Sequence, residues 1–179
     1  MKKFINQGII LMFLIVLSAA CKPSQKKLTD KVSSLEKNLS SYTFGKTDTA
    51  KLNLNTKDLL KTYQDFAKYY PDDSFAPTYI FRAANLCLNI NKPKQAIELF
   101  DELIKKYPSN KRIPDGLFIK AFIYDNSLKD YVQAKKFYEE FLTKYPQHPF
   151  ADDAKNSIKY LGKSPEEILD IISKEKGKQ

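Results

Sequence analysis

One pattern of apolar and polar positions occurs three times along the chain. It is found in LLKTYQDFAKYYP (59–71), AIELFDELIKKYP (96–108) and AKKFYEEFLTKYP (134–146). Apolar or small side chains recur at offsets 0, 4, 7, 8 and 11 of each segment, a spacing that places them on one stripe of an α-helix. Each segment ends in Tyr-Pro, and proline forces the preceding residue out of the α conformation. We therefore predict three amphipathic helices that all end at this motif.

A second helix is predicted before each of the last two copies, at residues 77–89 and 115–127. The final prolines of the three copies are 37 and 38 residues apart. A period of this size indicates stacked helical hairpins, because one hairpin cannot bury its own apolar face. We expect an all-α, right-handed solenoid of three to four hairpins. The predicted core faces of the preceding helices hold Ile80, Ala83, Ala84 and Cys87, then Phe118, Ala121 and Phe122.

The segment before the first copy contains a short amphipathic helix. Leucines and a valine alternate at spacings of four and three at Leu28, Val32, Leu35 and Leu39. We expect a helix that packs across the first repeat; the alternative is a coiled coil between two chains, for which this spacing is also suited. Residues 40–55 are polar and are predicted to form a loop.

The C-terminal segment has the signature of a further helix. Ser164 and Glu167 are spaced as a capping box, and Gly162 suits the end of the helix before it. Isoleucines follow at Ile168, Ile171 and Ile172. We expect them to cover the exposed apolar side of the last repeat, as solenoids require at their ends.

The N-terminus has the features of an export signal. Two lysines precede an apolar run that is shorter than the roughly 20 residues of a membrane-spanning helix. The run ends in LSAAC at Cys21, which resembles the bacterial lipobox. The resemblance implies cleavage before Cys21 and its modification with diacylglycerol and an acyl chain such as palmitate. The alternative is an ordinary signal peptide that ends near a cysteine.

These features divide the chain into four expected segments. Residues 1–20 form a lipoprotein signal peptide, and residues 21–55 a lipidated tether, short amphipathic helix and loop. Residues 56–161 contain the repeats. Residues 162–179 form a C-terminal capping helix and a basic tail.

The composition gives a basic protein with few reactive groups. The formal net charge is +9, and it falls to +7 without residues 1–20. The excess lysines either solvate helix faces or attract anionic headgroups, cell-wall polymers or an acidic protein; export argues against nucleic acid. Besides Cys21, the only thiol is Cys87, which is expected to pack as a small apolar side chain.

The sequence shows no pattern of residues typical of an active site. His148 is the single histidine, so the several His, Cys or carboxylate ligands of a zinc site are not present at defined spacing. No glycine-rich phosphate loop and no nucleophile with an evident base partner are found. We expect a protein that is not an enzyme and has no metal or cofactor.

The spacing of small residues resembles the tetratricopeptide repeat family. Ala83 and Ala96 lie thirteen residues apart, and the same spacing separates Ala121 and Ala134. The chain departs from the family consensus where Ala84 and Phe122 replace glycine. The junctions YPDDSFAP and YPQHPFAD resemble an envelope subgroup of this family. That subgroup includes the Tol-Pal-associated periplasmic repeat protein and the repeat lipoprotein of the outer-membrane β-barrel assembly machine.

The resemblance implies a concave binding surface made by the first helix of each hairpin. Its asparagine amides would bind the backbone of a partner, and its apolar side chains would form pockets. The alternative is that these residues pack within the superhelix. The residues concerned are Phe81, Asn85, Asn89, Ile119, Ile123 and Asn126.

The implied function is that of an adaptor in the bacterial cell envelope. The protein would be lipid-anchored, face the periplasm from the outer membrane, and hold an envelope protein or peptide segment during envelope assembly or maintenance. Its repeat domain is expected to be monomeric. The alternatives are a structural oligomer built through residues 28–39, and a carrier or receptor for a small molecule or glycan.

Overall fold

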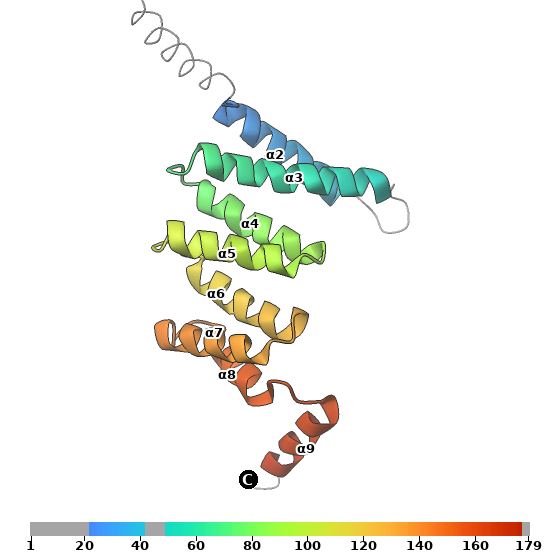
Figure 1. Cartoon of the computed structure of the whole chain (residues 1–179), viewed down its shortest axis with the longest axis vertical. Coiled ribbons are helices and arrows are strands. Elements are labelled where there is room, and N and C mark those ends of the chain that lie inside the picture. Colours follow the sequence, from blue (N-terminus) through green and yellow to red (C-terminus); the bar gives the residue numbers. More distant parts are fainter. Residues whose placement is uncertain (1–21, 42–48, 177–179) are drawn as a thin grey trace, which may run out of the picture. The chain divides into compact units, whose positions relative to one another are not determined.

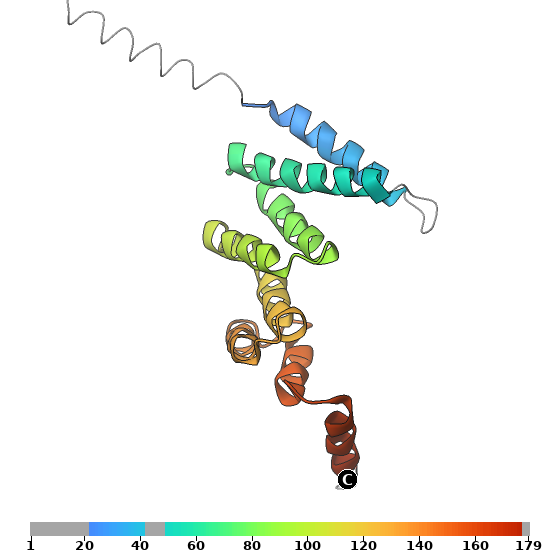
Figure 2. The ribbon, with the colours of Figure 1, turned by 45° about the vertical axis from the view of Figure 1, so that its right-hand side comes forward.

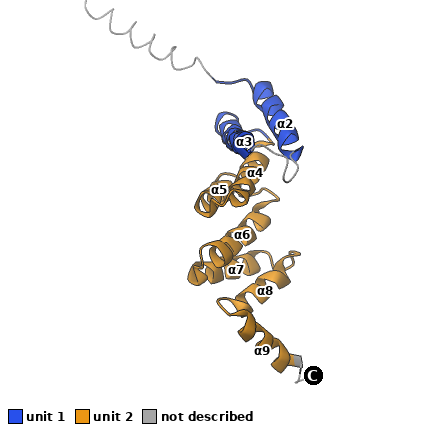
Figure 3. Ribbon diagram, turned by 90° about the vertical axis from the view of Figure 1, so that its right-hand side faces the viewer, with its two compact units in different colours: residues 1–73 blue, residues 74–179 orange. Residues whose placement is uncertain are grey.

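The computed structural model describes residues 22–41 and 49–176, and every regular element in these ranges is a helix (Figure 1). Cys21 and the expected signal peptide lie outside the described residues. The chain divides into two compact units, residues 1–73 and 74–179 (Figure 3). The helices are α2 (Gln25–Ser40), α3 (Thr49–Tyr69), α4 (Ala76–Asn89), α5 (Pro93–Lys106), α6 (Ile113–Phe122), the π-helical turn η1 (Ile123–Ser127), α7 (Tyr131–Lys144), α8 (Ala151–Tyr160) and α9 (Pro165–Lys176).

In the first unit, α2 packs along α3 as a helical hairpin. Leu28, Val32 and Leu35 of α2 are buried. The Tyr70 hydroxyl donates a hydrogen bond to the Pro23 carbonyl oxygen at 2.8 Å, which fixes the start of α2 beside the end of α3. Of the two interpretations of the leucine spacing, the structure confirms the helix that packs on the first copy.

The prediction of a loop over residues 40–55 was wrong for its second half. Helix α3 begins at Thr49, so residues 49–55 are helical, and residues 42–48 lie outside the described residues. Thr56 is buried, and its hydroxyl donates to the Leu52 carbonyl oxygen at 2.8 Å. Packing against α2 therefore stabilises residues 49–55 as a helix. Their polar composition alone does not indicate this helix. The boundary between the two compact units falls after α3.

In the second unit, helices alternate between two sides of a stack. Helices α4, α6 and α8 lie on one side and α5 and α7 on the other, as Figure 2 shows and Figure 3 confirms. Each helix packs on its neighbours in sequence from α4 to α8. This is the all-α solenoid that the repeat period predicts.

The Tyr-Pro motif ends the helices as predicted. Tyr107 and Tyr145 follow α5 and α7 with nearly identical backbone angles, φ −131° and ψ 56° against φ −135° and ψ 55°. These angles lie outside the α region, as expected for a residue before proline. The Asp130 side chain caps α7 by accepting a hydrogen bond from the Gln133 amide at 3.1 Å.

Small residues set the distance between neighbouring helices. Ala84, Ala96, Ala121 and Ala134 are completely buried. At Gly116 of α6, an added Cβ would lie 3.2 Å from the ring of Phe100 in α5. Larger side chains at these positions would push the helices apart, so the stacking of the repeats depends on the small residues.

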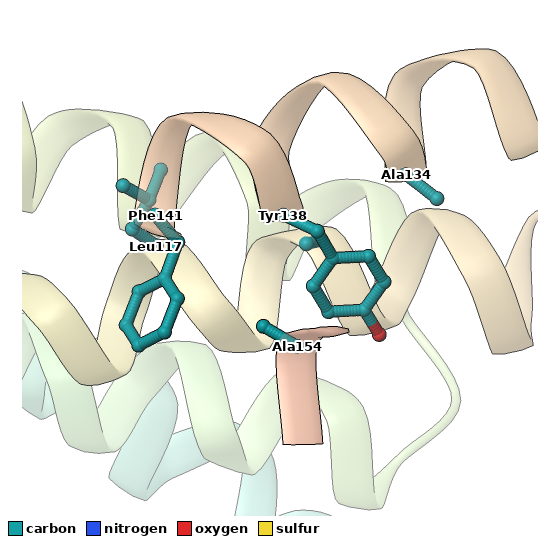
Figure 4. Close-up of a cluster of buried hydrophobic side chains, with 6 residues drawn as sticks. Leu117, Ala134, Tyr138, Phe141 and Ala154 are labelled. Carbon is teal, nitrogen blue, oxygen red and sulfur yellow. The ribbon is translucent and has the colours of Figure 1, made fainter. Parts of the chain in front are cut away.

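A cluster of buried side chains joins α6, α7 and α8 (Figure 4). It contains Leu117, Ala121, Ala134, Tyr138, Phe141 and Ala154. The ring of Phe118 covers its edge, with centroids 5.5 Å from Phe141 and 4.8 Å from Phe150. Successive hairpins therefore share one core.

At the C-terminus the capping box is confirmed, but the covering helix is not the one we expected. The Ser164 amide donates to the Glu167 carboxylate at 2.7 Å, and the Glu167 amide donates to the Ser164 hydroxyl at 3.2 Å. Helix α8 packs on α7, whereas the isoleucines of α9 are only half-buried and Leu169 is 68% exposed. The short α8 lies between α7 and α9 in the chain and takes the covering position.

We expect Phe141→Ala to lower the free energy of unfolding by about 3–5 kcal/mol, because it empties the centre of the shared core. Urea unfolding followed by circular dichroism measures this change. Val132→Ala is the control, since Val132 is 78% exposed on the same helix and should change stability by no more than about 0.5 kcal/mol. Similar effects of the two substitutions would contradict the assignment of Phe141 to the core.

Candidate functional site

On α4, the predicted concave residues are largely engaged within the protein. Phe81 is half-buried, with its ring edge against Phe100 at 5.8 Å between centroids and the Arg112 guanidinium 4.8 Å from its centroid. The Asn85 amide donates to the Phe81 carbonyl oxygen at 3.0 Å. Asn89 is exposed. Phe81 thus packs within the superhelix, which was the alternative that the sequence left open.

On α6, the exposed positions differ from the predicted stripe, and a π-helical turn follows the helix. The Leu128 amide bonds to the Ile123 carbonyl oxygen five residues back, at 3.0 Å. This turn holds one residue more than an α-helical turn. Ile123 is completely buried and Phe122 is 48% exposed. Placing Phe122 in the core and Ile123 on the binding surface was therefore wrong, and Ile119 is half-buried beside them.

A groove lies across α6, η1, α8 and the start of α9, next to Tyr131 of α7. The groove has a volume of about 550 Å³. Asn126 is the one predicted surface residue that lines it, and the sequence reasoning missed the others. The aromatic side chains along it are Phe118, Phe122, Tyr131 and Tyr160, and the polar ones include Asp125, Asn126, Asp153, Asn156 and Ser157.

A glycine shapes the end of the groove near α9. Gly162 has φ +71°, a left-handed conformation that side chains disfavour. A Cβ there would lie 3.2 Å from the ring of Tyr131. Only a glycine lets the chain turn closely over this ring, so Gly162 and Tyr131 together form this wall.

The groove contains a carboxyl group with a perturbed pKa. Burial raises the pKa of Asp125 above its ordinary value, and the nearby charge of Lys129 partly offsets the rise. A second carboxylate, Asp153, lines the same groove. Among the cations at the rim, Lys163 is 3.6 Å from the Glu167 carboxylate. The lining of the groove therefore includes two carboxylates, Asp125 and Asp153, and two lysines, Lys129 and Lys163.

A buried hydroxyl lies beneath the groove. Tyr138 is completely buried, and within the described ranges its hydroxyl has no hydrogen-bond partner of acceptable geometry. Burial raises its pKa, while the neighbouring Ser157 side chain lowers it and the Asp125 carboxyl raises it further. Figure 4 shows the hydroxyl at the end of the ring that points away from Phe141. Tyr138 itself is not among the residues that line the groove.

Comparison with protein families supports the repeat assignment. The family model of the tetratricopeptide repeat matches residues 80–110 and 115–148. These two segments are therefore similar to tetratricopeptide repeats. A search of curated proteins found no match. The first repeat contains α4 and α5, and the second contains α6, η1 and α7. The groove is formed by the first helix of the second repeat together with α8, which follows it.

The two repeats are joined by a buried lysine that the sequence analysis did not identify. Lys120 of α6 is 7% exposed. Its ammonium lies 2.5 Å from the Asp101 carboxylate in α5 and 3.8 Å from the ring centroid of Phe137 in α7. An ion pair and a cation–π contact thus compensate the buried charge. Lys120 holds the second repeat to the first and does not line the groove.

The remaining candidate residues have structural roles. His148 lies 3.4 Å from the Asp115 carboxylate, and its Nδ1 accepts from the Phe150 amide at 3.3 Å. Cys87 is buried in the first repeat, and burial raises the pKa of its thiol, which disfavours the reactive thiolate. Within residues 22–41 and 49–176, no group of three or more histidine, cysteine or acidic side chains could hold a metal ion.

None of the helices within residues 22–41 and 49–176 is both long enough and apolar enough to cross a membrane.

Asp125→Asn is expected to raise the stability of the protein at neutral pH. The raised pKa means that folding favours the protonated carboxyl, so the native state loses stability as pH rises through the raised pKa. The neutral amide avoids this loss, and its advantage should shrink as pH falls below the ordinary carboxyl range. Urea unfolding at several pH values tests both statements.

The control for this measurement is Asp152→Asn, one residue before Asp153 on α8. Asp152 is exposed, lies in the first turn of its helix and pairs with Lys155 at 2.9 Å. Its removal should leave stability unchanged or slightly lower, because it favours a helix N-terminus. Equal gains from both variants would refute the role of burial at Asp125.

Proposed function

We propose that the protein is a lipid-anchored adaptor of the bacterial cell envelope, and that its groove holds a segment of a partner protein. The main observation that supports this is the groove itself, on the first helix of a tetratricopeptide repeat. Tetratricopeptide repeats are protein-interaction scaffolds, so a general role in protein binding follows from the repeats. The envelope role and the anchoring rest on the sequence of the N-terminus.

The chemistry of the groove suits a polypeptide segment. Asn126 and Asn156 offer both a donor and an acceptor, as the backbone of a bound segment requires. Phe122 lies beside them with nearly half of its surface exposed, and an exposed aromatic side chain in a pocket is typical of a binding hot spot. The groove combines these features over about 550 Å³.

The first unit supports an adaptor over a structural oligomer. The side chains that a coiled coil between chains would use are Leu28, Val32 and Leu35, and they are buried within the hairpin of α2 and α3. Using them for association would require α2 to leave α3. The partner we propose is therefore a different envelope protein, held by the second unit.

The anchor we propose is a lipid on Cys21, which would place the protein on the outer membrane facing the periplasm. An acyl chain contributes about 0.8 kcal/mol per buried methylene, and several chains together bind a membrane almost irreversibly. The support is the LSAAC sequence and the apolar run before it.

Photo-crosslinking in intact cells tests the groove. A benzoylphenylalanine at Phe122 should capture one dominant envelope protein, because the partner covers this side chain. The same group at Lys105, which is exposed on α5, should not capture it. Adducts are identified by mass spectrometry, and equal capture from both positions would count against the groove.

Phe122→Ala should weaken the captured complex by about tenfold or more, the effect of removing a hot-spot aromatic. It should leave the thermal unfolding midpoint nearly unchanged, because the side chain is half-exposed. Affinity is measured with the purified partner. An unchanged affinity would show that the partner binds elsewhere.

Cys21→Ser should release the protein from the membrane fraction and abolish labelling with palmitate, since the thiol would carry the diacylglycerol group on which the anchor depends. Cys87→Ser is the control, because Cys87 is buried in α4 and should have no part in anchoring. Cell fractionation and mass spectrometry of the mature protein measure both. A Cys21→Ser protein that stays membrane-bound and labelled would refute the lipid anchor.

A further inference from the structure

Helix α2 of the first unit has an apolar side and a lysine-rich side. Leu28, Val32 and Leu35 are buried, and α2 packs on α3. The remaining side of the helix is exposed, and Asp30 is the one exposed acidic residue of α2. Four exposed lysines make up the surface that we call the lysine face: Lys26, Lys27, Lys31 and Lys37.

The charge of the lysine face is not offset by ion pairs. Within residues 22–41 and 49–176, none of its four ammonium groups lies within ion-pair distance of a carboxylate. Glu36, the other acidic residue of α2, is half-buried and accepts a hydrogen bond from the Tyr63 hydroxyl of α3. By contrast, several exposed lysines elsewhere pair within their own helix, as Lys144 does with Glu140 at 2.6 Å.

The start of α2 is fixed to the rest of the first unit. The Tyr70 hydroxyl donates to the Pro23 carbonyl oxygen at 2.8 Å, and the Lys22 ammonium lies 4.1 Å from the centroid of the same ring. The Gln25 side-chain amide donates to the Asp73 carboxylate at 2.6 Å. Residue 22 therefore already belongs to the folded hairpin, and no flexible tether lies between this residue and α2.

The proposed lipid on Cys21 would bring the lysine face close to a membrane. Gln25, the first residue of α2, is four residues after Cys21, and a chain of that length spans at most about 14 Å. Attraction between a lysine and an anionic membrane surface extends over about a Debye length, roughly 8–10 Å. Lysines in the first two turns of α2 would therefore lie near the range of this attraction as soon as the anchor inserts.

We propose that the lysine face binds the anionic phospholipid headgroups of the membrane that holds the anchor, so that the hairpin of α2 and α3 lies on the membrane surface. An ammonium group has three donors and no acceptor, which suits phosphate oxygens. Each lysine near an anionic surface strengthens binding by about fivefold. Because the anchor supplies a high local concentration, contacts that are weak alone suffice to orient the hairpin. This inference rests on the proposed function for the lipid anchor.

The first test uses the mature chain, residues 21–179, as the Cys21→Ser variant, so that binding is measured without the lipid. Sedimentation with vesicles of phosphatidylethanolamine and phosphatidylglycerol measures the affinity, and phosphatidylcholine vesicles are the comparison without net charge. We expect binding to the anionic vesicles alone, and its loss at high salt, because salt screens the attraction. Replacing all four lysines of the lysine face by glutamine should weaken binding by at least about tenfold.

A matched variant makes the same change in net charge away from the lysine face. It replaces four exposed lysines of the second unit by glutamine: Lys94, Lys105, Lys111 and Lys136. This variant should bind the anionic vesicles nearly as well as the Cys21→Ser chain that keeps all its lysines. Circular dichroism should show the same helix content in both variants, because exposed substitutions change stability little. Equal weakening by the two sets would reveal a general attraction of a basic protein and would overturn the inference.

The lipidated protein tests the orientation of the hairpin. It is reconstituted into each kind of vesicle and treated from outside with an amine-acetylating reagent, and the modified lysines are identified by mass spectrometry. The lysine face should be acetylated several-fold less in anionic vesicles than in phosphatidylcholine vesicles. Lys105, which is exposed on α5, should react equally in both. Equal acetylation of the lysine face in the two vesicles would contradict the proposed contact.

The remaining outcomes separate this inference from the proposed function. Binding to soluble polyglutamate but not to anionic vesicles would assign the lysine face to an acidic protein and overturn the inference. Absence of vesicle binding in a protein that is labelled with palmitate in cells would overturn the lysine face and leave the anchor intact. If the protein carries no lipid in cells, the anchor fails, whereas lysine-dependent binding to anionic vesicles would still support headgroup recognition by α2.

Discussion

The close approach of helices in the second unit is the constraint on which its other features depend. Each hairpin has an apolar face that it cannot bury alone, so hairpins must stack. Stacking at this distance requires small residues at the crossings, and Ala84, Ala96, Ala121 and Ala134 are all completely buried there. At Gly116 even one added carbon atom would press on the ring of Phe100. The position of the groove follows from this geometry, because it fixes which side of each first helix remains outside the core.

Most of the fold can be predicted from the sequence because its signals are local. The Tyr-Pro ends and the capping box of Ser164 each depend on residues within one turn, and each was found where expected. The start of α3 was missed, because residues 49–55 are polar and become helical by packing on α2. Propensity and composition report weakly on such tertiary stabilisation.

The candidate site was harder to predict, because the exposed side of α6 is not the one that the repeat spacing indicates. The spacing of Ala121 and Ala134 repeats that of Ala83 and Ala96, so both first helices were expected to present the same stripe. In the structure the buried side of α6 holds Leu117, Lys120 and Ala121, and a π-helical turn at Ile123–Ser127 follows the helix. Phe122 turns outward and Ile123 inward. No local sequence signal marks such a turn, and π-helical turns are frequent at functional sites.

The same turn ties stability to recognition. The turn places Asp125 in a partly buried position, where burial raises the pKa of its carboxyl and the nearby charge of Lys129 partly offsets the rise. Functional sites commonly trade some stability for activity. A partner segment in the groove would cover Phe122 and meet the amides of Asn126 and Asn156 at the same place, so apolar burial and polar contacts would reinforce each other there.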